Sequence, residues 1–168
     1  IVEIADNVID LTIAKISKLD RKTQQVLQLA ACIGNQFNLE ILCVVNNNHQ
    51  TTTARELQPA LAAGLIVPLS NDYTIPLLWE RSEIATDTLA ISEAFIPKIP
   101  QCIPYKFLHD RVQQAAYISI SEDEKQTVHL QIGRLLLASI TETELAENIF
   151  DVVNHLNKGI ELIVDRAE

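Results

Sequence analysis

Residues 105–117 read YKFLHDRVQQAAY, and within this stretch the pattern changes from that of a strand to that of a helix. The first three residues are typical of a short strand. From His109 or Asp110 to Tyr117, polar and apolar residues are spaced as in an amphipathic helix. His109 should therefore lie at a strand-to-helix junction, where the first amide groups of a helix have no partner within that helix.

Upstream of this stretch the sequence predicts four helices and one strand. Apolar residues recur there at helical spacing, and residues that commonly cap helices precede several of the runs. The predicted strand should pair with residues 105–107. The predicted elements are a helix from Val2 to Lys18, a helix capped by Asp20 and ended by Gly34, a short helix from Leu39 to Val45 capped by Asn38, a helix capped within threonines 51–53 and ending near Ala63, and a strand over Leu65–Leu69.

Downstream, the chain is predicted to be helical. Ser121 and Glu124 match the capping-box pattern that opens a helix, which should run to Ile140. Another helix should end near Leu156, and a last helix should begin at Ile160. These helices are typical of the start of a helical array.

The expected fold class is mainly α. Three helices that lead into a two-stranded ribbon are the arrangement of a winged-helix domain, here with a small wing. Antiparallel helices that begin a helical-repeat arm should follow it. The predicted divisions are a linking helix over 1–18, a winged-helix-like domain over 19–120 with a proline-containing insertion at about 73–104, and a truncated helical arm over 121–168.

Composition excludes several classes of function. The 168 residues carry 13 Lys and Arg against 22 Asp and Glu, a formal charge of −9. This balance argues against binding to nucleic acid or to anionic membranes, because both depend on cationic side chains. No apolar run is long enough to span a bilayer. The three cysteines form no Cys-x-x-Cys pair and the chain has no Met, so we expect a reduced, cytoplasmic piece of a longer protein.

The sequence contains none of the common catalytic motifs. It has no glycine-rich phosphate loop, no His-Glu-x-x-His pattern, no paired Cys and His spacing and no nucleophile elbow. We therefore expect no enzyme activity, no catalytic residue, no metal site and no cofactor in this chain.

The four histidines have different expected roles. His49 lies in a polar loop and should be solvated, whereas His129 and His155 lie on apolar helix faces and should pack or hydrogen-bond inside the fold. His109 has two interpretations from its position alone. It can be a structural cap partner for Asp110 and the next turn, or a side chain that points out from the top of the domain.

Five segments resemble a known family of signalling ATPases. They are similar to the region just after the AAA-like core of signal-transduction ATPases with numerous domains (STAND), and to large bacterial multi-sensor proteins that also carry serine/threonine kinase, GAF and histidine kinase domains. The segments are residues 23–39 (TQQVLQLAACIGNQFNL), 57–68 (LQPALAAGLIVP), 105–117 (YKFLHDRVQQAAY), 129–136 (HLQIGRLL) and 150–157 (FDVVNHLN).

The resemblance implies a regulatory role. In STAND proteins a winged-helix domain folds over the nucleotide held by the P-loop core, and in several branches the His of a Met-His-Asp triplet touches the β-phosphate of ADP. Here the triplet reads Leu108-His109-Asp110, so His109 and Asp110 are the implied nucleotide-sensing residues. The implied partners are the P-loop ATPase core and the helical repeats of a parent kinase, and the implied ligand is ATP or ADP with Mg²⁺ in that parent.

Two alternative functions were compared with this one. A DNA-binding winged helix should carry several cations on its recognition helix, yet residues 51–63 offer only Arg55 beside Glu56. A helical scaffold that binds a protein partner through the arm is compatible with the regulatory role. Such a scaffold should show an exposed apolar patch on the last two helices.

Overall fold

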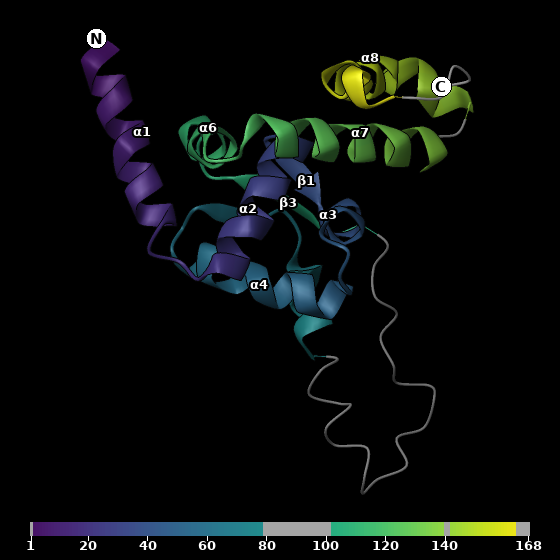
Figure 1. The fold of residues 1–168 in the computed structure, drawn as a ribbon. Helices are drawn as coiled ribbons and strands as arrows, with labels where there is room; N and C mark the ends of the chain where they lie inside the picture. Colours follow the sequence, from purple (N-terminus) through teal and green to yellow (C-terminus); the bar gives the residue numbers. More distant parts are fainter. Residues whose placement is uncertain (1, 79–101, 140–141, 164–168) are drawn as a thin grey trace, which may run out of the picture.

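The computed structural model describes residues 2–78, 102–139 and 142–163. The fold is mainly helical with a small antiparallel sheet, as the sequence predicted (Figure 1). The elements are α1 (Val2–Ile16), α2 (Arg21–Ile33), β1 (Gln36–Asn38), α3 (Leu39–Asn46), α4 (Gln50–Ala62), β2 (Ile66–Pro68), the 3-10 helix η1 (Asn71–Thr74), β3 (Pro104–Phe107), α6 (Asp110–Ile118), α7 (Glu122–Ser139), α8 (Glu142–Lys158) and the 3-10 helix η3 (Ile160–Leu162).

The sheet has three strands in the order β1-β3-β2, and both pairings are antiparallel. The predicted pairing of β2 with β3 is confirmed, with Ile66 opposite Phe107. The expectation of only two strands is wrong, because β1 pairs with the other edge of β3 and places Phe37 opposite Tyr105. Three residues are too few to show strand alternation, so the tertiary pairing with β3 defines β1.

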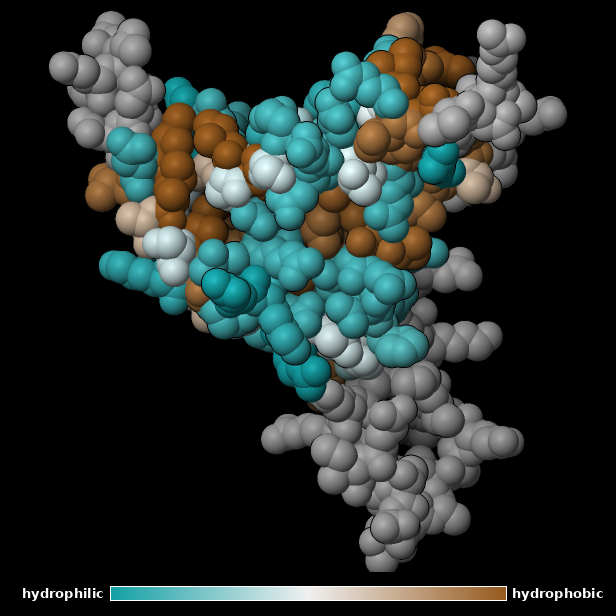
Figure 2. All heavy atoms as spheres, in the orientation of Figure 1, coloured by the Kyte–Doolittle hydropathy of each residue, from teal (hydrophilic) through white to brown (hydrophobic). Residues whose placement is uncertain are grey.

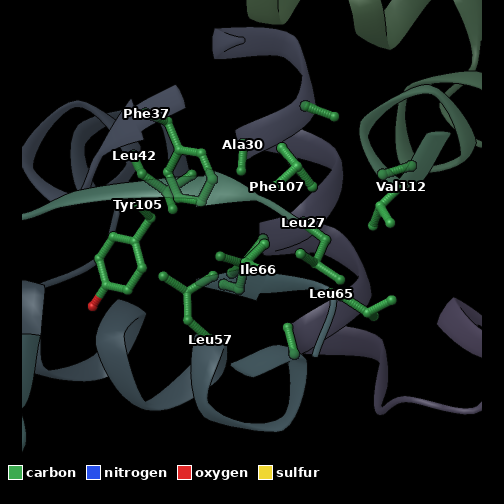
Figure 3. Close-up of a cluster of buried hydrophobic side chains, with 14 of the residues drawn as sticks. Leu27, Ala30, Phe37, Leu42, Leu57, Leu65, Ile66, Tyr105, Phe107 and Val112 are labelled. Atoms are coloured by element: carbon green, nitrogen blue, oxygen red, sulfur yellow. The ribbon is translucent and has the colours of Figure 1, made fainter. Parts of the chain in front are cut away.

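The main hydrophobic core surrounds β3. The Phe37 ring stacks on Tyr105 with centroids 5.7 Å apart and lies tilted against Phe107 at 5.6 Å. Leu27 from α2 and Leu57 from α4 are fully buried in the same cluster (Figure 3). Because β3 is the central strand and carries two buried aromatic rings, it connects the sheet to the helices that cover it.

Two predicted helix boundaries are confirmed at α2. The Asp20 carboxylate accepts hydrogen bonds from the Thr23 amide (3.0 Å) and hydroxyl (2.7 Å), so it caps the helix. These bonds hold the pKa of Asp20 below its ordinary value, because they favour the ionised carboxylate. Gly34 ends the helix with φ of 156°, and its amide donates to the Ala30 carbonyl oxygen.

The predicted start of α4 is wrong. His49, not a threonine, occupies the cap position, and the helix begins at Gln50. Thr53 lies fully buried inside the helix, where its hydroxyl accepts a hydrogen bond from the side-chain amide of Asn46 at 3.2 Å. A threonine that favours a cap in isolation is used here to join α3 to α4.

Helices α7 and α8 lie side by side and form a hairpin, with α7 against α2 and α3 (Figure 1). The capping box that opens α7 is confirmed, since the Glu124 amide donates to the Ser121 hydroxyl and the Ser121 amide donates to the Glu124 carboxylate, each at 3.4 Å. Cys32, Ile120 and Ile132 belong to a second apolar cluster under α7. The helix predicted from Ile160 is a short 3-10 helix as far as it is described.

Other expectations meet the structure only in part. Most of the predicted insertion, residues 79–101, lies outside the described residues. Cys32 and Cys43 are buried free thiols, and burial raises the pKa of each to about 11. Within the part of the chain that the structure describes, no helix has the length and apolar character needed to cross a bilayer.

Candidate functional site

The junction between β3 and α6 holds His109 and Asp110 on the surface. Two backbone hydrogen bonds fix it, from the Phe107 amide to Asn35 (2.9 Å) and from the Leu108 amide to Leu65 (3.0 Å). His109 occupies the cap position of α6 in an extended conformation, and its side chain makes no capping hydrogen bond. Its exposed imidazole is therefore not a structural side-chain cap.

Asp110 begins α6 and is tied to the end of α2. The Asn35 side-chain amide donates a hydrogen bond to the Asp110 carboxylate. A carboxylate in the first turn also interacts favourably with the positive end of the helix. Gln113, one turn later, donates to the Ala31 carbonyl oxygen at 3.1 Å. The start of α6 is thus positioned on α2 by side chains from both helices.

A cleft of about 830 Å³ opens between the end of α2, the first turns of α6 and one face of α8. Asp110 and Gln113 line the α6 side, while Asp151, His155 and Lys158 line the α8 side. The lining is largely polar and carries both signs of charge. The cleft therefore lies where the hairpin meets the rest of the fold.

At the inner end of this cleft, His129 and His155 face each other. Their Nδ1 atoms lie 2.8 Å apart, and the Nε2 atom of His129 lies 3.0 Å from the Tyr117 hydroxyl. The two residues are 1% and 8% exposed. The sequence correctly placed both histidines inside the fold, but it contained no sign that they touch, because they are on different helices.

Burial lowers the pKa of both histidines, because a charged imidazole loses its hydration there. The pKa of His129 falls from 6.5 to about 4, and the nearby cations Lys158 and Lys125 contribute in the same direction. For His155, Lys158 also lowers the pKa, while Asp151 and the Ile33 backbone oppose the shift. Both rings are therefore neutral near pH 7.

The structure adds no metal-ligand cluster to these features. Across residues 2–78, 102–139 and 142–163, no three His, Cys, Asp or Glu side chains are grouped so as to hold a metal ion. What the described surface offers is an exposed imidazole at a helix N-terminus, beside a polar cleft with a buried histidine pair. These groups can bind and transfer protons by hydrogen bonds.

Comparisons with known proteins place the chain next to one signalling protein. It is 30% identical to hybrid signal transduction histidine kinase G from Dictyostelium discoideum over 187 aligned residues. The alignment covers 99% of this chain but 5% of that kinase, so the chain spans about one twentieth of its relative's length. No family model matches the chain. No solved structure matches it either.

Proposed function

We propose that this chain is a non-catalytic regulatory segment of a larger signal-transduction protein. Near end-to-end similarity to 5% of a signalling histidine kinase supports a role within a much longer chain. The helices α2, α3 and α4, followed by the antiparallel strands β2 and β3, support a winged-helix-like unit. In this proposal the unit acts as a lid over the nucleotide of a STAND-type ATPase core, and the α7–α8 hairpin relays its position to the following domains.

The position of His109 carries the proposal. The imidazole is exposed at the N-terminus of α6, where free amides and the helix dipole favour an anion. Asp110, held by Asn35, keeps that helix start in place. In the proposed closed state, His109 donates a hydrogen bond to a phosphate of ADP. In the open state this bond is absent, so ADP favours closure.

His109→Ala in the full-length parent should weaken ADP retention by about 10- to 150-fold, since a hydrogen bond to a charged group contributes about 1.5–3 kcal/mol. Loss of the closed state should also raise basal kinase output. The measurement is the dissociation constant and release rate of a fluorescent ADP.

The matched control is His49→Ala. His49 is also an exposed helix cap without a capping hydrogen bond, but it belongs to α4. It should leave ADP release unchanged. Equal ADP affinity in the His109→Ala protein and the wild type would contradict the proposed contact.

Protein binding through the arm is a second candidate, and a specific observation favours it. Phe150 on α8 is 82% exposed, and Figure 2 shows hydrophobic surface over that helix. Other apolar side chains on α7, α8 and η3 are also exposed, although less than Phe150. They are Leu137, Ile149, Val153, Ile160 and Leu162. An exposed apolar patch of this kind is typical of a contact surface. The DNA-binding alternative gains no electrostatic support from a charge of −9.

Phe150→Ser should leave the free energy of unfolding of this chain within about 0.5 kcal/mol of wild type, because the ring is exposed. In the parent protein it should reduce the regulated output if the arm makes a functional contact. Chemical denaturation and a kinase assay measure the two effects. Thr127→Ser, at an exposed polar position on α7, is the control. An unchanged output in the Phe150 variant would contradict the scaffold role.

A further inference from the structure

The hydrogen bonds around His129 and His155 form a continuous chain between three helices. It runs from the Tyr117 hydroxyl on α6 through His129 on α7 to His155 on α8. The Ile33 backbone at the end of α2 also interacts with the His155 ring and favours its protonated form. These hydrogen bonds thus form a polar connection between the α7–α8 hairpin and the rest of the fold.

The ring nitrogens of the two histidines limit how many protons this series of hydrogen bonds can hold. Two Nδ1 atoms at 2.8 Å need one N–H donor and one acceptor. If His155 donates through Nε2 to Ile33, its Nδ1 accepts from His129, and the Tyr117 hydroxyl then donates to His129 Nε2. One added proton would go to His129 Nε2, which then donates to the Tyr117 hydroxyl oxygen, so that this hydrogen bond reverses its direction. A second would set two N–H groups against each other.

The charges that face the pair oppose even the first proton. Lys125 on α7 and Lys158 on α8 lie over the Tyr117 ring, at 4.7 Å and 5.6 Å from its centroid, and both disfavour a cationic His129. Glu122 is engaged with Lys125 at 2.7 Å. Asp151 on α8 acts in the opposite direction on His155. Cys32 on α2 and Tyr117 on α6 stay neutral below pH 8, because burial raises the pKa of each.

We propose that the His129–His155 pair is a proton-controlled joint, which holds the α7–α8 hairpin against α2 and α6 near neutral pH and releases it on acidification. Release would widen the polar cleft that Asp110 and His155 line from opposite sides. The joint consists of the buried pair and the groups around it, and none of its hydrogen bonds involves His109. It is therefore independent of the nucleotide contact proposed for His109.

The sign and size of the effect follow from the pKa of His129. It is about 4 in the closed form and returns to 6.5 when the ring is hydrated. As pH falls through 6.5, His129 takes up a proton in the open form but not in the closed form. The closed form therefore loses stability relative to the open form between about pH 6.5 and pH 4. Between pH 7.5 and pH 5 this one ring shifts the opening equilibrium by roughly 30-fold.

Hydrogen exchange of the whole 168-residue chain at pH 7.5 and pH 5.0 tests the joint, with each rate divided by its intrinsic rate at that pH. Protection of α7 and of residues 150–158 should fall by roughly 30-fold, while protection of α4 changes little. His129→Gln should flatten this difference, because it removes the titrating ring, and His49→Gln should preserve it. An equal fall in α4, or no fall in the hairpin, would overturn the proposal.

A second measurement needs no variant and remains decisive if the substituted proteins do not fold. NMR of the wild-type imidazoles should show that His129 keeps its neutral-ring chemical shift from pH 8 to pH 5.5 while the hairpin is closed. A His129 ring that titrates near 6.5 with hairpin amides still protected would refute the joint.

Discussion

Phe107→Ala should lower the free energy of unfolding by about 3–5 kcal/mol, the cost of a large cavity in a packed core. Phe107 is 2% exposed, lies on the central strand and contacts the Phe37 ring. Because small domains are stable by only about 5–15 kcal/mol, this loss should leave a measurable unfolded population at 37 °C. Urea denaturation followed by circular dichroism gives the difference.

The adjacent residue supplies the matched control. Leu108 is 43% exposed and follows the strand, so Leu108→Ala should change the unfolding free energy by less than about 1 kcal/mol. Comparing Phe107→Ala with Leu108→Ala distinguishes the effect of losing a buried side chain from a general effect of alanine at the β3–α6 junction. Equal effects of the two substitutions would mean that the aromatic cluster does not stabilise the fold as described.

Gly159→Ala should destabilise the hairpin by about 1–3 kcal/mol, because an added methyl group overpacks a close contact. A Cβ at this position would lie 2.7 Å from the Leu130 Cβ and 2.9 Å from the Gln126 carbonyl oxygen. Neither atom belongs to the mobile end of a side chain, so the end of α8 must move away from α7. Hydrogen exchange should show the loss in α7 and α8 before the sheet is affected.

Asn157→Ala, two residues earlier and exposed, is the control and should stay within about 0.5 kcal/mol of wild type. Gly159 has a φ of −104°, which alanine adopts readily, so backbone strain does not enter the comparison. Full stability of the Gly159→Ala protein would show that α7 and α8 are not held as closely as the structure has them.

Several features could be predicted because their cause is local in the chain. The Asp20 cap with Thr23 and the Ser121–Glu124 box each join residues three apart, and Gly34 ends α2 within one turn. Such signals are present in any short window of sequence. The exposed strand-to-helix junction at His109 is of the same kind, whereas the nucleotide contact of His109 was implied only by the family resemblance.

Other features depend on residues far apart in the chain. Gln36–Asn38 is a strand only because β3, about 70 residues later, offers an edge. His129 and His155 meet only because α8 folds back along α7, and Gly159 is needed only where it approaches Leu130. The Thr53 hydroxyl was expected at a cap, but packing of α3 on α4 gave it a different partner.

The sequence by itself determined the helical periods, most of the caps and the net negative charge, since these depend on spacing and composition, and its order of elements predicted the pairing of β2 with β3. Tertiary structure alone decided the third strand, the start of α4, the cleft beside α8 and the contact between two buried histidines. The physical reason is that a hydrogen bond or a close contact needs a partner within a few ångströms. Only the packed fold brings residues from separate helices that near.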